Sequence, residues 1–353
     1  MPALDPRRVI PVTVLAGFLG AGKTTLLNQL LRQSALADAA VLINEFGDVA
    51  IDHHLVDKVD DQLVVFASGC LCCSMRGELA RSLRDLFMRR LRREIPPFSR
   101  VLIETTGLAD PAPVLSTLLE DFFIAARFRI DGVVTAVDVT HAEQQLGRHV
   151  EAVRQVAMAD RLLLTKCDLA TPGEIARVAQ RLTRANPGAP QIEVRHGRIA
   201  AEQVVGCGLY DPASRTADVR RWLAEEKVAA NRPGEQPRHA HDVNRHDALV
   251  HAFVLRFEDP FVWPDFAEAI DVLLATCGDR ILRIKGLVGV RGEGAPRVVH
   301  CVQHMRYPYS LLAAWPDGDQ RSCLVFIVRA LAREVVEKAF VMFCGNAAAR
   351  DGE

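Results

Sequence analysis

The fold is decided by the stretch Gly17-Phe18-Leu19-Gly20-Ala21-Gly22-Lys23-Thr24, which fits the pattern G-x-x-x-x-G-K-[ST]. An apolar run from Val9 to Ala16 precedes it and predicts a buried strand, and a helical run from Thr25 to Leu31 follows it. In this context, small residues let backbone N–H groups curve around phosphate oxygens, and the helix N-terminus adds a positive partial charge. The stretch therefore predicts a nucleotide-phosphate loop between a strand and a helix.

The positions of this loop have separate expected roles. The small residues that allow the backbone to approach the phosphates are Gly17, Gly20, Ala21 and Gly22. Lys23 is expected to reach the β- and γ-phosphates, and the Thr24 hydroxyl is expected to hold Mg²⁺. Thr25 completes the predicted nucleotide site. The alternative is a glycine turn that only packs a strand on a helix.

Length, charge and cysteine content exclude several classes of protein. At 353 residues the chain is long enough for two domains. Its 43 basic and 44 acidic residues nearly cancel, so no bulk charge favours nucleic acid or a membrane surface. No apolar run approaches the roughly 20 residues of a membrane-spanning helix, and no signal-type segment precedes Val9. The odd number of cysteines, nine, favours reduced thiols, and we expect a cytoplasmic protein.

Strands alternate with helices through the first part of the chain, a pattern that predicts βαβ units. We therefore expect a P-loop α/β fold with a mainly parallel sheet and helices on both faces, its ligand loops at the carboxyl ends of the strands. After the first strand, the predicted strands are 40–43, 63–67, 100–104, 130–137, 161–164 and 191–194, and the predicted helices include 75–93, 113–119 and 172–184.

Composition shifts to Pro, Gly, Asn, His and charged residues near position 226, which predicts a linker. Beyond it, predicted strands outnumber helices, so a smaller α+β domain with an antiparallel sheet is expected. We predict a P-loop domain over 1–225, a linker over 226–247 and a C-terminal domain over 248–345. The C-terminal strands are expected at 249–257, 280–290, 297–305 and 322–328, and its helices at 264–276 and 331–343.

Thr165-Lys166-Cys167-Asp168 stands at the end of a predicted strand, where GTP-binding proteins carry Asn-Lys-x-Asp. An Asp at position 168 can accept hydrogen bonds from guanine N1–H and N2–H₂, which adenine lacks. A buried polar group left unpaired costs about 1–3 kcal/mol, enough to discriminate between bases. Thr165 replaces the usual Asn, and its hydroxyl can make one of that amide's bonds. A polar loop without a ligand is the alternative.

Glu104-Thr105-Thr106-Gly107 closes another apolar strand. Glu104 is expected to act on Mg²⁺ as the second carboxylate position, and the N–H of Gly107 to approach the γ-phosphate because no side chain blocks it. A structural capping role for Glu104 is the alternative.

The segment Gly69-Cys70-Leu71-Cys72-Cys73 places three thiols together in front of a predicted helix. Three thiolates suit Zn²⁺, with Co²⁺ and Cu⁺ as alternatives, and they leave one tetrahedral position open. An open position is what a transferable metal requires. Candidates for the fourth ligand are Glu45, His53 and His54. Buried structural thiols are the alternative, and the spacing does not fit a C-x-x-C redox pair.

Other candidates carry less information. The linker histidines His239, His241 and His246 can bind metal or simply be solvated. The segment Arg283-Ile-Lys285-Gly286 is either a basic partner patch or a strand with alternating apolar and charged positions. We expect the scattered cysteines to be core or surface residues; they are Cys167, Cys207, Cys277, Cys301, Cys323 and Cys344.

Five motifs together resemble the CobW-type (CobW/HypB/UreG class) metallochaperone GTPases, a class of P-loop GTPases that includes nickel-insertion proteins. These motifs are 17–25, 44–47, 69–73, 104–111 and 165–169. The C-terminal part resembles the CobW C-terminal domain through 281–286 and 324–328. Two features depart from the family pattern: Thr165 in place of Asn, and only a few histidines where cobalamin-pathway members carry a long His-rich tract.

The resemblance implies GTP hydrolysis coupled to delivery of Zn²⁺, or Co²⁺, from the C-x-C-C motif to a client metalloprotein. It implies GTP, Mg²⁺ and zinc as ligands, Lys23, Thr24 and Glu104 as the hydrolytic residues, and leaves a homodimer open. Two rivals remain. A P-loop small-molecule kinase would prefer ATP and have no use for Asp168 or C-x-C-C, and a metal-storage protein would bind nucleotide only for stability.

Overall fold

The computed structural model describes residues 9–44, 65–68, 75–207, 250–316 and 319–349. By contacts, the chain divides into two compact units. The first comprises Met1–Gln145, Ala159–Gln180 and Ala189–Gly208, and the second comprises Leu146–Met158, Arg181–Gly188 and Leu209–Glu353. Within the described ranges, no helix is both long enough and apolar enough to cross a membrane.

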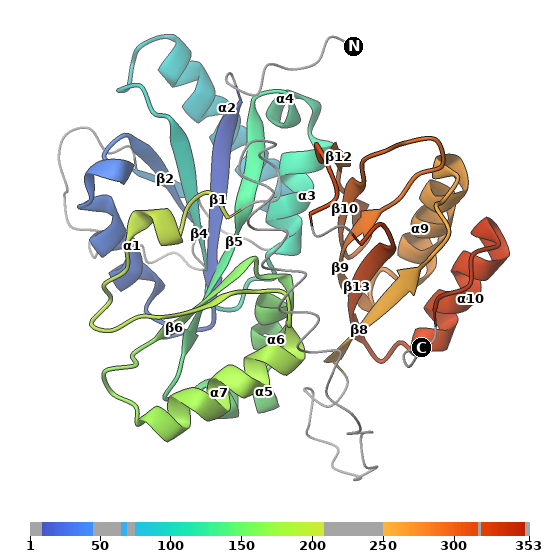
Figure 1. Cartoon of the computed structure of the whole chain (residues 1–353). Coiled ribbons are helices and arrows are strands. Elements are labelled where there is room, and N and C mark those ends of the chain that lie inside the picture. The colour runs from blue at the N-terminus through green and yellow to red at the C-terminus, as the bar shows by residue number, and fades with distance from the viewer. Residues whose placement is uncertain (1–8, 45–64, 69–74, 208–249, 317–318, 350–353) are drawn as a thin grey trace. The chain divides into compact units, whose positions relative to one another are not determined.

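The first unit contains a seven-stranded sheet in the order β3-β2-β4-β1-β5-β6-β7. Every neighbouring pair is parallel, so the carboxyl ends of the strands meet at one edge (Figure 1). Its strands are β1 (Ile10–Gly17), β2 (Ala39–Asn44), β3 (Val65–Ser68), β4 (Arg100–Thr105), β5 (Phe128–Asp138), β6 (Arg161–Thr165) and β7 (Gln191–Glu193). This arrangement confirms the predicted P-loop α/β fold.

Helices connect these strands and cover both faces of the sheet (Figure 1). The apolar side of α1 packs on the sheet through Leu26, Leu27 and Leu30, each of them buried. The first helices are α1 (Lys23–Leu31), α2 (Met75–Leu91), α3 (Ala112–Glu120) and the short α4 (Phe122–Ala125). Those that follow are α5 (Ala142–Arg148), α6 (Val150–Met158) and α7 (Pro172–Ala185).

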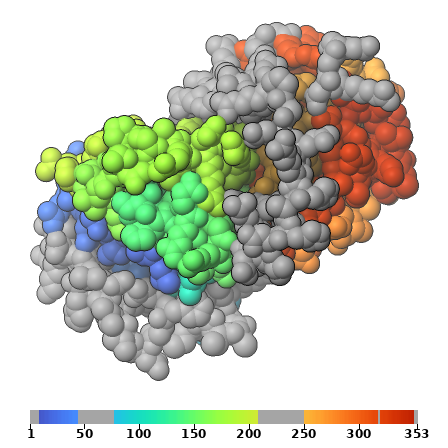
Figure 2. Space-filling model, turned by 90° about the horizontal axis from the view of Figure 1, so that it is seen from below, coloured from blue at the N-terminus to red at the C-terminus, as the bar shows by residue number. Residues whose placement is uncertain are grey.

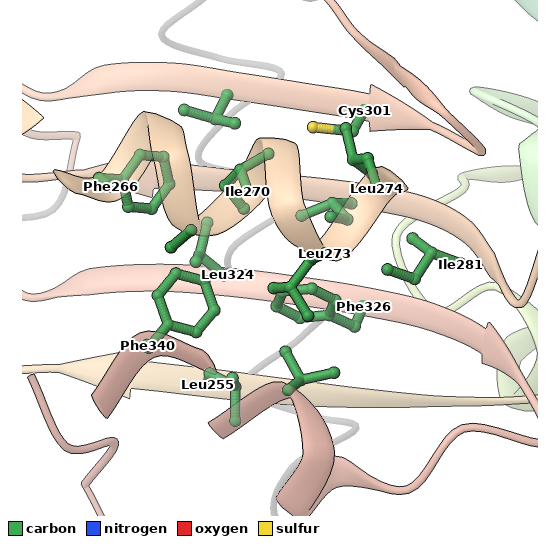
Figure 3. Packing of buried hydrophobic residues seen from close by; sticks show 14 of the residues in the cluster. Leu255, Phe266, Ile270, Leu273, Leu274, Ile281, Cys301, Leu324, Phe326 and Phe340 are labelled. Atoms are coloured by element: carbon green, nitrogen blue, oxygen red, sulfur yellow. The ribbon is translucent and has the colours of Figure 1, made fainter. Parts of the chain in front are cut away.

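The second unit contains the predicted antiparallel sheet, in the order β11-β10-β9-β13-β8, with β12 paired to β10. Its strands are β8 (Val250–Phe257), β9 (Ile281–Val288), β10 (Arg297–Val302), β11 (Met305–Arg306), β12 (Ser310–Leu311) and β13 (Ser322–Arg329). Two helices, α9 (Trp263–Cys277) and α10 (Arg333–Cys344), pack on one face of this sheet. Figure 3 shows Phe266, Ile270 and Phe340 from these helices meeting Leu324 and Phe326 of the sheet.

One open alternative in this unit is settled by burial. Strand β9 is buried along its whole length, and only 2% of Arg283 and 8% of Lys285 are exposed. The guanidinium of Arg283 donates to the carbonyl oxygen of Met158 at the end of α6, within the same unit, at 2.5 Å. The interpretation of these residues as an exposed basic partner patch is therefore wrong. Arg283 instead satisfies a helix C-terminal carbonyl.

The scattered cysteines are free thiols, and five of the six are buried. Burial raises the pKa of Cys167, and it raises the pKa of Cys344 to about 11. A raised pKa keeps the thiol protonated and poorly reactive. The expectation that these residues are core or surface positions is confirmed.

Candidate functional site

The phosphate loop connects β1 to α1 at the carboxyl edge of the sheet, as predicted. Gly17 has a φ of 143°, and a Cβ at this position would lie 2.5 Å from the Ala136 carbonyl oxygen on β5. Gly20 and Gly22 have φ values of 73° and 84°, in the left-handed region. Only glycine adopts these conformations at little cost, so the loop's shape follows directly from its composition.

Lys23 begins α1, and its side chain turns back over the loop. Its ammonium donates to the carbonyl oxygens of Gly17 at 2.9 Å and Phe18 at 3.3 Å. These contacts hold a buried cation directly above the backbone that would surround the phosphates. The ammonium is therefore placed to exchange carbonyl oxygens for phosphate oxygens.

Thr24 and Glu104 are brought together from α1 and β4, eighty positions apart in the sequence. The Thr24 hydroxyl donates to Oε1 of Glu104 at 3.0 Å. Glu104 is buried and lies inside β4. Nearby in the chain, the hydroxyl oxygen of Thr106 is buried without a hydrogen-bond partner among the described residues. These are hard oxygen donors, the type that Mg²⁺ prefers.

Gly107 lies directly against the phosphate loop. A Cβ at this position would lie 2.6 Å from the backbone nitrogen of Leu19. Any larger residue would push the loop after β4 away from the loop after β1. The absence of a side chain at Gly107 therefore lets the two loops touch, and the predicted approach of its N–H to the γ-phosphate stays a prediction.

Thr165 connects the predicted base loop, residues 165–168, to the phosphate loop. Its hydroxyl lies 2.8 Å from the carbonyl oxygen of Ala21 and 3.2 Å from that of Val137. The side chain is buried, so these carbonyls replace the water that it loses on folding. Thr165 thus cross-links its own loop to the phosphate loop.

Asp168 lies at the surface of the same loop. Its carboxylate accepts a hydrogen bond from the backbone N–H of His196 at 2.9 Å, and the His196 ring nitrogen Nδ1 lies 3.3 Å from its other oxygen. The backbone hydrogen bond from His196 is the main cause that lowers the pKa of Asp168. The carboxylate is therefore ionised at neutral pH and able to accept hydrogen bonds.

The segment after β7 also contributes residues beside Asp168, and the sequence did not predict this. His196 and Gly197 both have positive φ values, and a Cβ on Gly197 would lie 2.9 Å from a methyl carbon of Thr25 on α1. In Figure 2, yellow-green atoms lie beside blue atoms from the first part of the chain, in agreement with the approach of Gly197 to Thr25. The signal for it was an Arg-His-Gly triplet directly after a predicted strand.

Sequence reasoning also assigned no role to Asp138, the last residue of β5. Its buried carboxylate accepts a hydrogen bond from the ammonium of Lys166 at 2.7 Å. Asp138 and Thr165 are partners in the register between β5 and β6, so the ion pair crosses the carboxyl edge of two adjacent strands. The available signal was an acidic residue closing the most strongly β-branched strand.

Several predicted site residues lie outside the described residues. They are Glu45, Cys70, Cys72 and Cys73, together with His53, His54 and the linker histidines. Among the residues that are described, no group of three or more His, Cys, Asp or Glu side chains is placed to hold a metal ion.

Comparison with known proteins gives matches over most of the chain. The zinc chaperone YjiA of Escherichia coli (strain K12) is 34% identical over 331 residues, which cover 94% of this chain and 98% of YjiA. The zinc-regulated GTPase metalloprotein activator 1 of Saccharomyces cerevisiae is 25% identical, over 94% of this chain and 83% of that protein. A crystal structure of zinc-bound YjiA GTPase from E. coli has a TM-score of 0.69 at 28% identity, and the match covers 95% of this chain and 99% of that one.

Family models match both parts of the chain. Residues 11–193 match the CobW/HypB/UreG nucleotide-binding domain, and residues 250–343 match the cobalamin synthesis protein cobW C-terminal domain. The first match contains the phosphate loop, the Thr24–Glu104 contact and the base loop. The chain therefore belongs to the CobW/HypB/UreG family, and it carries that family's CobW-type C-terminal domain.

Proposed function

We propose that this protein is a GTP-hydrolysing metallochaperone that binds Zn²⁺ at its C-x-C-C motif and transfers it to client metalloproteins. The observation that carries the proposal is the hydrogen bond from Thr165 to the carbonyl oxygen of Ala21. It joins the loop that carries Asp168 to the phosphate loop. One nucleotide can then meet phosphate-binding and base-reading groups at the same edge of the sheet.

The hydrolytic half of the proposal rests on three side chains. Lys23 would hold the β- and γ-phosphates, and Thr24 and Glu104 would hold Mg²⁺, directly or through water. Two positions after Glu104 in the chain, the hydroxyl oxygen of Thr106 is buried and has no hydrogen-bond partner among the described residues. Held by these side chains, Mg²⁺ would supply positive charge that stabilises the phosphoryl group during transfer. The residues present fit the ion.

Guanine selectivity would come from Asp168. Its ionised carboxylate offers two acceptor oxygens, and guanine offers N1–H and N2–H₂ donors. Adenine at the same place would leave the carboxylate facing an acceptor. The hydrogen bond from the His196 N–H fixes one carboxylate oxygen and leaves lone pairs on both for the base.

The metal half of the proposal rests on the sequence and on where the chain leaves the sheet. Ser68, the last residue of β3, is in register with Asn44 of β2, which is in register with Thr105 of β4. The chain therefore enters the C-x-C-C segment from the end of β3. Two inter-strand spacings, about 10 Å in total, separate the end of β3 from the end of β4. Relatives named zinc chaperones in E. coli and Sinorhizobium support zinc as the cargo.

This proximity suggests how the two halves are linked. Nucleotide contacts at Glu104 and Gly107 would order the loops that follow β2 and β4, and C-x-C-C lies between these loops in the sequence. The ordering would set the geometry of the Cys70, Cys72 and Cys73 thiolates and hence their metal affinity. Hydrolysis would return the site to its other state after transfer.

We propose a cytoplasmic location and a client protein as the partner, because delivery requires a protein that accepts the metal where the thiols stay reduced. GTP and GDP are the small-molecule partners. Self-association as a homodimer is compatible with this role and is tested by sedimentation at several protein concentrations.

Competition binding and phosphate release test the nucleotide half of the proposal directly. We expect GTP and GDP to displace a fluorescent guanine nucleotide at least about tenfold better than ATP, since unpaired polar groups at Asp168 disfavour adenine. Phosphate release from GTP should be lost in Lys23→Ala. Preference for ATP, together with a phosphorylated small-molecule product, would instead identify a P-loop kinase.

A further inference from the structure

The carboxylate of Asp138 collects donors from three side chains at the carboxyl edge of the first sheet. The Lys166 ammonium donates to Oδ2 at 2.7 Å, and Nδ1 of His141 lies 3.0 Å from the same oxygen. The hydroxyl and backbone N–H of Thr140 donate to Oδ1 at 2.6 and 2.9 Å. Only 2% of the Asp138 side chain is exposed, whereas 34% of the Lys166 side chain is. A buried carboxylate thus fixes a partly exposed lysine.

Lys166 has an unusual backbone conformation. Its φ is 59°, in the left-handed region that long side chains rarely adopt. Contacts on both sides of Lys166 fix this turn: the N–H of Val139 donates to the carbonyl oxygen of Thr165, and the N–H of Leu169 donates to that of Lys166. Strained backbone of this kind collects at ligand sites, where surrounding contacts hold it.

The direction of the Lys166 side chain follows from its two ends. Its Cα follows the last residue of β6, and its ammonium is held at the last residue of β5. The four-carbon stem therefore crosses from one strand end to the next, along the edge where Asp168 and the phosphate loop also lie. An aliphatic stem held in this way offers an apolar surface to one face of a flat base.

The charges around Asp138 keep it ionised. Burial acts to raise the pKa of Asp138, but the hydrogen bonds from Lys166, Thr140 and His141 outweigh burial and lower the pKa below its ordinary value. An ionised Asp138 attracts the Lys166 ammonium across the whole neutral pH range.

We infer that Asp138 is a positioning residue for the nucleotide base: it holds Lys166 across the strand ends so that the lysine stem packs against the purine. The inference rests on the proposed function, because it assumes that a purine nucleotide binds at this edge. Asp138 contacts neither phosphate nor base in this account, and it acts only through Lys166. The contribution is the same for GTP and GDP, which share the base.

The test compares Asp138→Asn with the intact protein in nucleotide binding and in GTP hydrolysis. Asparagine keeps the shape and removes the charge, so we expect the affinities for GTP and GDP to fall equally, by about tenfold. KM for GTP should rise by a similar factor, while kcat at saturating GTP changes by less than about twofold, because Lys23, Thr24 and Glu104 are unaffected. A fall in kcat with KM unchanged would overturn the inference.

A double-mutant cycle tests whether Asp138 acts through Lys166. Lys166→Met keeps most of the stem and removes the ammonium, so it should raise KM by itself. In the Lys166→Met background, Asp138→Asn should then raise KM for GTP by less than a further factor of about two. If Asp138→Asn raises KM in the Lys166→Met background as much as it does in the intact protein, Asp138 acts independently of Lys166 and the inference is refuted. If Asp138→Asn does not fold, the KM of Lys166→Met decides the question.

The matched control is Asp131→Asn in the same strand. Asp131 is also buried, and it accepts hydrogen bonds from Thr13 and the backbone N–H of Gly206. It lies seven residues before Asp138, away from the carboxyl edge. Asp131→Asn should lower the free energy of unfolding but leave the affinity for GDP within about twofold. An equal loss of affinity in this control would attribute the effect to general destabilisation.

The failure of the inference and the failure of the proposed function give different results. If the intact protein binds neither GTP nor GDP, the proposed function is wrong and the inference falls with it. If the intact protein binds both and Asp138→Asn binds them equally well, only the inference is wrong.

Discussion

At position 165, where GTP-binding proteins carry Asn, the hydroxyl of a threonine connects two loops. The bond to Ala21 is 2.8 Å long and buried, so it rigidifies the base loop relative to the phosphate loop. The Thr165 hydroxyl has only one proton to donate, and the carbonyl oxygen of Val137 is a second acceptor within hydrogen-bond distance. The sequence alone left the effect of this replacement open, and the geometry shows that the Thr165 hydroxyl is bonded to the carbonyl oxygens of Ala21 and Val137.

Thr165→Val should weaken nucleotide binding without unfolding the protein. Valine has the same shape but cannot donate to the Ala21 carbonyl, so we expect GTP affinity to fall by about tenfold, or about 1.4 kcal/mol. The control is Thr117→Val, which removes a buried hydroxyl that donates to Pro113 within α3. Equal GTP affinities in the two variants, measured by titration calorimetry, would refute a linking role for Thr165.

The ion pair of Asp138 should also appear in the pH dependence of stability. The pKa of Asp138 is lower in the folded protein than in the unfolded chain. The ionised carboxylate therefore adds to the free energy of unfolding above the ordinary Asp pKa, and this stabilisation is lost as pH falls through the folded-state pKa. Urea unfolding should show intact protein more stable than Asp138→Asn by about 1–3 kcal/mol at pH 7. That difference should shrink below about pH 4. A difference that is constant with pH would contradict the ion-pair account.

Residues of the site differ in how far the sequence could reveal them. The placement of Lys23 and Thr24 at the start of α1 and of Glu104 near the end of β4 was predictable, because each belongs to a strand or loop pattern with a known chemical demand, and their roles in hydrolysis stay predictions. Asp138 and His196 were not predictable, since a single acidic residue or a histidine near a strand end has many structural explanations. Their roles depend on which strands are neighbours, and single-sequence patterns do not give the strand order.

At the scale of elements, the predicted strands and helices agree with the structure to within a few residues. Strong β-branched runs such as that of β5 gave reliable predictions. The short elements α4, β11 and β12 were missed, because runs of two to four residues carry no detectable period. The close contact of β9 with β13 at Gly286 was equally invisible in the sequence.

Gly286 illustrates how one position limits a whole strand. A Cβ there would lie 2.4 Å from the Cys323 carbonyl oxygen and 2.4 Å from a methyl carbon of Leu324 on β13. Gly286→Val should therefore separate β9 from β13 and lower the free energy of unfolding by about 1–3 kcal/mol. Gly294→Val, where no atom lies within 4 Å of an added Cβ, is the control. Chemical denaturation of both variants measures the difference, and equal stabilities would show that the strands can adjust.

At the scale of the whole molecule, the nucleotide state must control metal affinity if a chaperone is to release its metal to a client. The parallel strands place the residues that we propose to bind nucleotide at one sheet edge, and the chain enters the C-x-C-C segment from that edge. Thermodynamic reciprocity requires that any effect of GTP on zinc affinity be matched by an equal effect of zinc on GTP affinity.

The most direct test is the zinc affinity of the intact protein with GTP, with GDP and without nucleotide, measured by competition with a chelating indicator. The account predicts affinities that differ by at least about fivefold between the GTP and GDP states, the lower end of typical coupling energies. The difference should disappear when Cys70→Ser, Cys72→Ser and Cys73→Ser are combined. Equal zinc affinity in all three nucleotide states of the intact protein would contradict the proposed delivery role.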